Sequence, residues 1–309
     1  MTETGLGGFQ SARVWRDGTV TTLPSAGSEG ATADGMARVG NDVFVVGTER
    51  SGLKTRALYW RNGAPAYLTD GARSSGAQAV AILGSDVLIA GWERNPSGNE
   101  VATVWRTGVP TALTDGSRNS WATSLAVSGA DVLVAGSMHL GGNANRIAMC
   151  WRNGVPTVLT DGSRDALAWS VGVAGSDIVV AGFVAGSNGN NVAMIWKNGV
   201  PTALTDPSVS GVATSILVHG PDVYVSGSAL ADGTLSPRLW KNGAALPLEA
   251  GGPGHHADAW SVRVSGSDVY VVGSGMDQGT FAAKVWKNGT PVAITDGSVT
   301  TWGRAILVP

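Results

Sequence analysis

The sequence predicts an all-β fold, a seven-bladed β-propeller of four-stranded antiparallel blades, and a regular internal repeat carries this prediction. A tetrapeptide of the form Trp-[Arg/Lys]-[Asn/Asp/Thr]-Gly recurs at intervals of 44 to 46 residues. A leucine or isoleucine stands eight residues after each tryptophan, and an aspartate begins an apolar run in the middle of each unit. A fixed period of this length is the signature of a repeat architecture. The tryptophans of the tetrapeptide are Trp15, Trp60, Trp105, Trp151, Trp196, Trp240 and Trp286.

Each unit contains four short apolar segments separated by turn residues, and these predict four strands, named a to d in chain order. In one unit they cover residues 122–127, 131–136, 148–151 and 156–160. The Asn-Gly pair that follows the tryptophan, as in Asn153-Gly154, predicts a tight hairpin because a type I′ turn needs positive φ at both central residues. Successive strands therefore pair antiparallel as a meander.

The residue types of the strands indicate how the blades are arranged. Strand b is apolar at consecutive positions, as in residues 43–46, so both of its faces are expected to be buried between neighbouring blades. Strand a carries an alanine nine residues before the turn aspartate, and small side chains suit the crowded axis of a ring. Strand d is expected at the outer edge because proline, which donates no ladder hydrogen bond, recurs in it at Pro65, Pro110, Pro156, Pro201 and Pro291.

The two ends of the chain are expected to close the ring. Seven c and d pairs occur but only six a and b pairs, and residues 302–308 align with strand a. We therefore expect a single domain over residues 1–309, with a closing blade made of about residues 1–25 plus 298–309. Strand b of this blade is either replaced by residues 2–6, which we favour, or missing.

Composition excludes several partners. The net charge is -2, the pI is near 6.1 and no Lys/Arg-rich run exists, so we expect no nucleic-acid partner. No apolar run approaches the ~20 residues of a membrane span, which predicts no membrane insertion.

The single cysteine excludes an intramolecular disulfide framework. The first ten residues lack the basic and apolar regions of a secretory signal, and we expect a monomer that is cytosolic or, as favoured, an extracytoplasmic mature form.

The repeat resembles a bacterial group of Trp-repeat propellers with units of the type YVAG…AxxWKNG…LTDG. The matching residues are Val179–Gly182, Ala193–Gly199 and Leu204–Asp206, and the resemblance covers nearly the whole chain. It implies the propeller fold and no particular activity. Regular propellers of this type have also served as templates for symmetric designed proteins, although the repeats here diverge more than an imposed symmetry would produce.

Most conspicuous residues are explained by folding. The repeated tryptophans are expected to pack between blades, the basic residue after each to be a solvated turn charge, and Asp70, Asp115, Asp161, Asp206 and Asp296 to cap turns. Cys150 stands where the other repeats have an aliphatic residue or, in one case, Tyr59, and it is expected to be a core thiol. No catalytic motif is found, so we expect no catalytic residue, no metal site and no cofactor.

Variation between repeats is the better guide to a binding site. Eight residues before the turn aspartate the copies differ, and all are expected at one mouth of the central channel or at the adjoining blade interface: Asp34, Gln78, Thr123, Trp169, Thr214, Trp260 and, by extension, Arg304. Neighbouring loops are expected to hold Trp92, Arg94, Arg118, Trp121, His139, Arg164, His255, His256 and Trp302. The candidate ligand-binding set is Trp169, Trp260, Trp121, Trp302, Arg304, Asp34, Gln78 and His255.

Tryptophan beside arginine and polar groups suits a sugar or another small polar ligand. The leading hypothesis is therefore a non-enzymatic, lectin-like binding propeller with a carbohydrate or protein ligand. The alternatives are a protein-interaction or structural scaffold, including an engineered or model propeller, and an enzyme whose site in the channel uses Asp34, His255 and Arg304. In a further alternative the tryptophans only plug the channel or cover blade edges.

Overall fold

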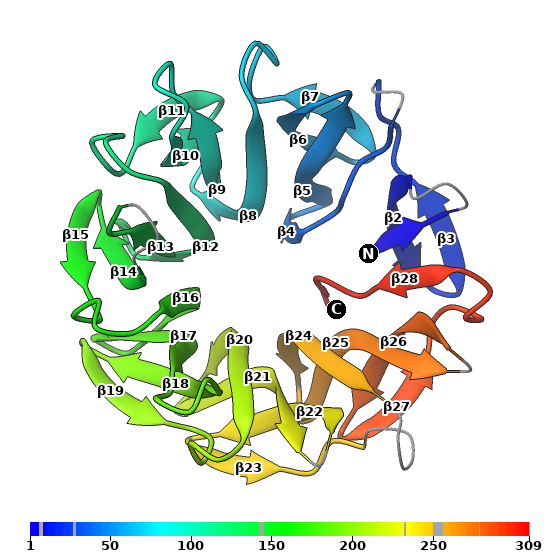
Figure 1. The fold of residues 1–309 in the computed structure, drawn as a ribbon. Helices are drawn as coiled ribbons and strands as arrows, with labels where there is room; N and C mark the ends of the chain where they lie inside the picture. Colours follow the sequence, from blue (N-terminus) through cyan, green and yellow to red (C-terminus); the bar gives the residue numbers. More distant parts are fainter. Residues whose placement is uncertain are drawn as a thin grey trace.

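The computed structural model describes residues 1–5, 9–26, 29–141, 145–231, 233–249, 256–277 and 279–308. They form seven four-stranded antiparallel sheets arranged as a ring about one axis (Figure 1). The predicted seven-bladed β-propeller is therefore confirmed. Within the described residues no helix is long and apolar enough to span a membrane.

Six blades follow the chain in order, each with the predicted succession of strands a, b, c and d. Blades 1 to 3 consist of β4 (Gly35–Val39), β5 (Asp42–Ser51), β6 (Lys54–Arg61) and β7 (Ala64–Tyr67); β8 (Ser75–Leu83), β9 (Asp86–Arg94), β10 (Glu100–Arg106) and β11 (Val109–Ala112); and β12 (Ser120–Ser128), β13 (Asp131–His139), β14 (Arg146–Arg152) and β15 (Val155–Val158). Blades 4 to 6 consist of β16 (Ala166–Ala174), β17 (Asp177–Ala185), β18 (Asn191–Lys197) and β19 (Val200–Ala203); β20 (Ser210–His219), β21 (Asp222–Ala231), β22 (Thr234–Lys241) and β23 (Ala244–Leu246); and β24 (Ala257–Ser265), β25 (Asp268–Asp277), β26 (Thr280–Lys287) and β27 (Thr290–Ala293).

The seventh, closing blade joins the two ends of the chain. Its strands lie in the order β28 (Thr300–Trp302), β1 (Thr2–Thr4), β2 (Gln10–Arg16) and β3 (Thr19–Thr22). Residues 2–4 thus occupy the second half of strand b, so the favoured replacement by residues 2–6 is confirmed for these three residues. Residue 5 lies beyond the strand, and residue 6 is outside the described residues. Both chain ends lie near the centre of the ring (Figure 1).

The turns between c and d have the geometry that their sequences require. Asn153 and Gly154 both adopt positive φ, of 52° and 82°, as a type I′ hairpin demands. The asparagine also binds the start of strand b, since Asn153 Nδ2 donates to Asp131 Oδ1 at 2.7 Å and Asn153 Oδ1 accepts from the Val132 amide at 2.8 Å. Each a-to-b turn is therefore fastened to the c-to-d turn of the same blade.

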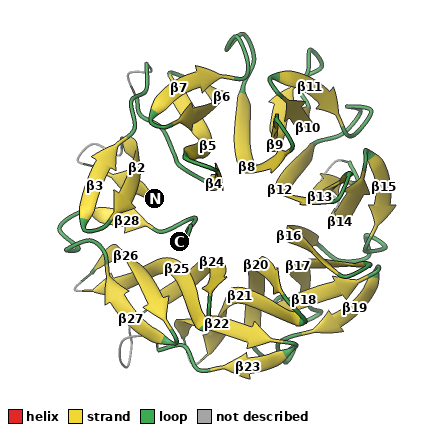
Figure 2. Cartoon of the chain, turned by 180° about the vertical axis from the view of Figure 1, so that it is seen from behind, coloured by secondary structure: helices red, strands yellow, loops and turns green. Residues whose placement is uncertain are grey.

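Strand a is innermost and strand d outermost, as the small and proline residues predict (Figures 1 and 2). Ala77, Ala122, Ala168, Ala213 and Ala259 of the inner strands are fully buried. The prolines of strand d each stand opposite the repeated tryptophan, as in the pair Trp105 and Pro110, on the open edge of the sheet.

The core is divided among the interfaces between blades. Six clusters of buried apolar residues fill six of these interfaces, and each contains the repeated tryptophan of one of blades 1 to 6. The tryptophan of one blade reaches the preceding blade, where Trp151 Nε1 donates to the Leu113 carbonyl at 3.1 Å and Trp286 Nε1 to that of Glu249 at 2.7 Å. The expectation that the repeated tryptophans serve packing is confirmed for these six.

Candidate functional site at the axis

The positions that vary between repeats are β-bulges. In blades 2 to 6 the pairing of strand a with strand b skips one residue, and the skipped residues are Gln78, Thr123, Trp169, Thr214 and Trp260. Asp34 and Arg304 hold the equivalent places beside β4 and β28. A bulged residue leaves the strict alternation of the strand, so its side chain can be aimed away from the blade interface. We call these seven residues the bulge ring.

A glycine of strand b makes room for each bulge. A Cβ on Gly136 would lie 2.0 Å from the Trp121 carbonyl oxygen, and one on Gly182 would lie 1.9 Å from that of Leu167. Neither glycine has a positive φ, so close approach of the backbones is what requires glycine here. The same contact recurs in the other blades at Gly47, Gly91, Gly227 and Gly273.

The two threonines of the bulge ring bind neighbouring blades together. Thr123 Oγ1 lies 2.7 Å from the Ala168 carbonyl oxygen of the next blade, and Thr214 Oγ1 lies 2.6 Å from that of Ala259. Each hydroxyl also lies 3.1 Å from a carbonyl of its own blade. A small hydroxyl is therefore sufficient for the structural role of this position. The side chains at the other five positions are larger or charged, and this structural role does not require them.

Three of the larger side chains contact one another at the centre of the ring. The rings of Trp169 and Trp260 meet edge to face, with centroids 6.2 Å apart, although blade 5 separates their blades. The Arg304 guanidinium lies 4.1 Å from the centroid of the Trp260 ring, within cation–π distance. All three are half-buried, so part of each remains available to solvent.

Two carboxyl groups complete this cluster. Asp34 accepts a hydrogen bond of 2.6 Å from Thr32 Oγ1, and Asp258 Oδ1 accepts one of 2.8 Å from the Ser274 amide. Burial raises the pKa of both Asp34 and Asp258 above its ordinary value, and in both cases Arg304 opposes the rise. Arg304 thus stands within electrostatic reach of two carboxyl groups. We call Asp34, Trp169, Asp258, Trp260 and Arg304 the axial cluster.

The axial cluster combines an aromatic platform, a cation and two carboxyl groups whose ionisation is disfavoured. A guanidinium held on an aromatic ring presents planar donors suited to a carboxylate or carbonyl oxygen. Carboxyl groups near it can receive an ammonium or amide N–H. The cluster can therefore bind a small molecule that carries both kinds of group.

The structure separates the eight residues of the sequence-predicted site. Asp34, Trp169, Trp260 and Arg304 come together in the axial cluster, and Gln78 is a half-buried member of the bulge ring. Trp121 lies in β12, where Nε1 donates to Glu100 at 2.6 Å and the ring meets His139 edge to face. Trp302 lies in β28 and stacks on Phe281 at 4.5 Å. His255 lies outside the described residues.

Two details of the prediction need correction. Trp92, Arg94, Trp121, His139 and Trp302 lie in strands rather than in loops, because strands a and b extend beyond the bulge toward that face. The sequence prediction also missed Asp258. The available signal was its position, since an acidic residue stands there where the other repeats have Thr32, Gly76, Trp121, Leu167, Val212 and Trp302.

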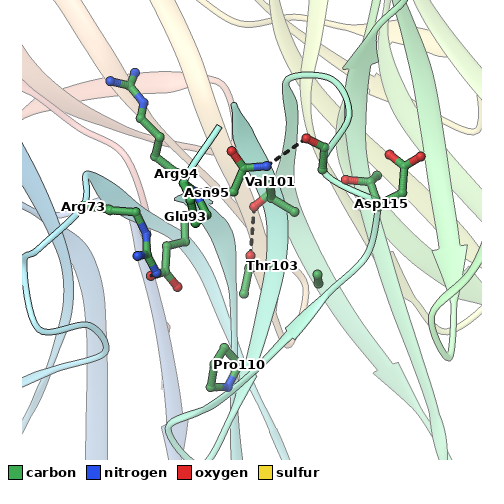
Figure 3. A pocket seen from close by; sticks show the side chains of 12 residues that line it. Arg73, Glu93, Arg94, Asn95, Val101, Thr103, Pro110 and Asp115 are labelled. Atoms are coloured by element: carbon green, nitrogen blue, oxygen red, sulfur yellow. Dashed lines mark hydrogen bonds and ion pairs between the residues drawn. The ribbon is translucent and has the colours of Figure 1, made fainter. Parts of the chain in front are cut away.

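A pocket lies on the face of blade 2, away from the axis. This pocket of about 350 Å³ is lined by Arg73, Glu93, Arg94, Asn95, Thr103 and Asp115, among others (Figure 3). Its polar groups are paired: Arg73 with Glu93 at 3.5 Å, and Asn95 Nδ2 with the Gly116 carbonyl at 2.8 Å. Blade 4 has a pocket in the same place, of about 520 Å³, lined by Arg164, Val184, Met194 and Pro201. The recurrence indicates that the repeat geometry produces these pockets.

The remaining candidate groups are explained by structure. Each basic residue after the repeated tryptophan in blades 1 to 6 pairs with the turn aspartate of its blade, as Lys197 does with Asp177 at 2.7 Å. The Asp-Gly aspartates cap their turns, as Asp161 Oδ1 accepts from the Ser163 amide at 2.9 Å. Cys150 is buried, and burial raises the pKa of its thiol to about 11. The described residues contain no cluster of three His, Cys, Asp or Glu that could hold a metal ion.

Comparison with known proteins extends to the fold. No family model and no curated protein sequence matches the chain. The structure is similar to that of a puromycin-hydrolyzing peptidase from Mycobacterium tuberculosis, with a TM-score of 0.63 and 14% sequence identity, over 93% of this chain and 50% of that one. An acylaminoacyl peptidase from Pyrococcus horikoshii matches with a TM-score of 0.46 and 11% identity, over 86% of this chain and 53% of that one. The chain therefore spans about half the length of these solved structures.

These comparisons correct the functional prediction. We expected from the sequence a non-enzymatic binding propeller that recognises a glycan or another small polar ligand, with a scaffold role as the alternative. The comparison contradicts this prediction, because a solved structure that shares the fold over 93% of this chain is a peptidase. At 14% identity this similarity shows the fold alone. The chain is a seven-bladed propeller, and the part of the peptidase that it matches makes up half of the peptidase chain.

Proposed function

We propose that this propeller is the substrate-selecting module of a peptidase-type hydrolase, and that its axial cluster contacts the peptide. Hydrolysis would add water across a peptide bond, and in this proposal a second module supplies the catalytic groups. The Mycobacterium tuberculosis peptidase supports this division, because the likeness covers only half of its chain.

The axial cluster is the observation that carries the proposal. Thr123 and Thr214 show that a small hydroxyl meets the structural need at a bulge position. Trp169, Trp260 and Arg304 are larger than this role requires. Trp260 contacts both Trp169 and Arg304, and Arg304 lies within electrostatic reach of the Asp34 and Asp258 carboxyl groups. Buried polar groups collected where the fold does not need them are typical of a binding site.

Peptides suit the chemistry of this cluster. The Arg304 fork can donate two hydrogen bonds to a backbone carbonyl or a terminal carboxylate. Asp258 and Asp34 can accept from a terminal ammonium or a backbone N–H, and the Trp260 and Trp169 rings can cover an apolar side chain. Membership of the Trp-repeat group, a monomeric state and an extracytoplasmic location are further parts of the proposal that rest on the sequence.

Peptide titration tests the proposal. Short peptides of two to five residues, with free or blocked termini, would be titrated calorimetrically into the wild-type protein and into Arg304→Gln and Trp260→Ala. We expect saturable binding that either substitution weakens about tenfold or more, as loss of a charge-assisted hydrogen bond or an aromatic contact would produce. Lys287→Gln, at a c-to-d turn, is the matched control and should bind as the wild type does. Peptides that fail to bind at millimolar concentration, or that bind equally to all variants, contradict the proposal.

A further inference from the structure

The closing blade differs from the other six in the first half of strand b, the half that follows the a-to-b turn. In blade 3 the last residues of strand c pair on both sides: Cys150, Trp151 and Arg152 lie opposite β15 and also opposite Ala135, Val134 and Leu133 of β13. The equivalent residues of the closing blade, Val14, Trp15 and Arg16, pair only with β3. The β1 contacts of strand c end at Arg13, whose amide donates to the Met1 carbonyl at 2.9 Å.

Strand a of the closing blade is unpaired over the same stretch. β28 pairs with β1 through residues 300–302, and residues 303–308 continue toward the centre of the ring without strand pairing (Figure 1). In blade 3 the corresponding residues 124–128 pair with residues 131–135 of strand b. Residues 14–16 and 305–308 are thus two backbone edges that no described residue bridges. We call them the unpaired edges.

The side chains beside the unpaired edges are exposed in a way that their counterparts are not. Trp15 is 39% exposed, whereas the other six repeated tryptophans are at most 3% exposed. The described residues also form no buried apolar cluster between blade 6 and the closing blade, although clusters fill the other six interfaces. An exposed tryptophan next to free backbone donors and acceptors is typical of a site for an added strand.

Charge indicates which residue begins that strand. In blades 1 to 6 the basic residue after the tryptophan pairs with the aspartate that opens strand b, as Lys287 does with Asp268 at 2.7 Å. Among the described residues Arg16 pairs only with its neighbour Asp17, at 3.6 Å, and the two side chains are 84% and 92% exposed. Asp17 stands where most other blades have an asparagine, whose side-chain oxygen accepts a hydrogen bond from the amide that follows the turn aspartate, as Asn153 does from Val132. The Asp17 carboxylate can accept the same hydrogen bond. An acidic residue is therefore the natural partner of Arg16.

We propose that the unpaired edges bind an extended polypeptide segment of the strand-b type: an acidic residue followed by four apolar residues rich in valine. The six other blades define this chemistry, since each fills the equivalent place with an aspartate and four further residues, as in Asp-Val-Leu-Val-Ala at residues 131–135 of blade 3. These four residues are apolar in every one of the six blades except blade 5, where the last is Ser226. The segment runs antiparallel to both edges. Its third, fourth and fifth residues lie opposite Arg16, Trp15 and Val14, and its apolar side chains enter the interfaces on both sides of the closing blade.

The probe for this proposal is a labelled peptide with the sequence of residues 130–136, followed by two lysines for solubility. Fluorescence anisotropy should show saturable one-to-one binding to the wild-type protein, with a blue shift of tryptophan emission. Trp15→Phe should remove most of that shift while saturable binding remains. A peptide carrying Leu133→Pro should not bind, because proline blocks a backbone donor and distorts the strand.

A charge exchange makes the test specific. Arg16→Glu should weaken binding about tenfold or more, and a peptide carrying Asp131→Lys should recover it on that variant. Arg61→Glu is the matched control, because Arg61 occupies the same turn in blade 1, where Asp42 is already in place; it should bind as the wild type does. Absence of saturable binding at millimolar peptide, or binding that Arg16→Glu leaves unchanged, overturns the proposal. The axial cluster shares no residue with the unpaired edges, so the peptide-selection proposal stands or fails separately.

Discussion

The repeated tryptophans give seven positions in one protein at which the same substitution should have very unequal effects. Trp151 is fully buried in the interface between blades 2 and 3, and its indole donates to the Leu113 carbonyl. Trp15 has the same place in the repeat but is 39% exposed. Replacement of each by phenylalanine therefore compares a packed copy with an unpacked one.

The expected magnitudes follow from these contacts. Trp151→Phe removes the hydrogen bond, which costs about 1 kcal/mol and more if the carbonyl is left unpaired. The smaller ring also leaves unfilled volume, which adds roughly 1–2 kcal/mol. We expect Trp151→Phe to lower the free energy of unfolding by about 2–3 kcal/mol, and Trp15→Phe to change it by roughly 0.5 kcal/mol or less.

Urea unfolding followed by far-UV circular dichroism would measure the two effects, since a change in midpoint at constant slope reports a change in stability. Trp60→Phe and Trp286→Phe are the matched controls and should resemble Trp151→Phe, because both indoles are fully buried and also donate to a backbone carbonyl. Equal effects at Trp15 and Trp151 would refute the conclusion that the closing blade lacks the packing of the others.

Three further predictions concern stability and reactivity. Burial raises the pKa of Asp258, so the stability that this carboxyl contributes is complete below its ordinary pKa of 3.8 and is lost as pH rises through the raised pKa. The melting temperature of Asp258→Asn should therefore increase relative to that of the wild type between about pH 4 and pH 7. A difference in melting temperature that stays constant over this range would contradict the prediction. Cys150 is buried and its thiol pKa is raised to about 11, so iodoacetamide at about pH 8 should label it only after unfolding, and rapid native labelling followed by mass spectrometry would disprove the assignment as a core thiol. Gly136→Ala places a Cβ 2.0 Å from the Trp121 carbonyl oxygen and should lower the free energy of unfolding in urea by about 1–3 kcal/mol. An unchanged midpoint for this variant would show that the bulge does not need glycine. Gly154→Ala tests a different constraint, because Gly154 has a φ of 82°.

The sequence predicts the fold well because its signals are local and repeated. The Asn153-Gly154 pair specifies a hairpin by backbone geometry, the strand-d prolines mark an edge, and the inner alanines mark the crowded axis. The replacement of strand b by residues 2–4 also followed from the count of segments. That the first half of this strand is missing among the described residues became clear only from the strand pairing in the structure. The exposure of Trp15 likewise depends on residues that are distant in the sequence.

The candidate site was predicted less completely. Comparison between repeats identified Asp34, Trp169, Trp260 and Arg304, because variation at one position of a regular unit needs no knowledge of contacts. It could not show that Thr123 and Thr214 tie blades together or that Trp121 is held by Glu100, since those partners come from other strands. Asp258 was missed because its neighbours in space, Ser274 and Arg304, are far from it along the chain.

A crystal structure of the protein soaked with a saturating tripeptide would show whether the axial cluster contacts a peptide. We expect peptide density at the axis, with an apolar side chain against Trp260 or Trp169, an oxygen within hydrogen-bond distance of Arg304, and an N–H or ammonium near Asp258 or Asp34. Peptide bound only in the pockets of blades 2 and 4, or no peptide at the axis at saturating concentration, would contradict the assignment of the axial cluster as the substrate-contacting site.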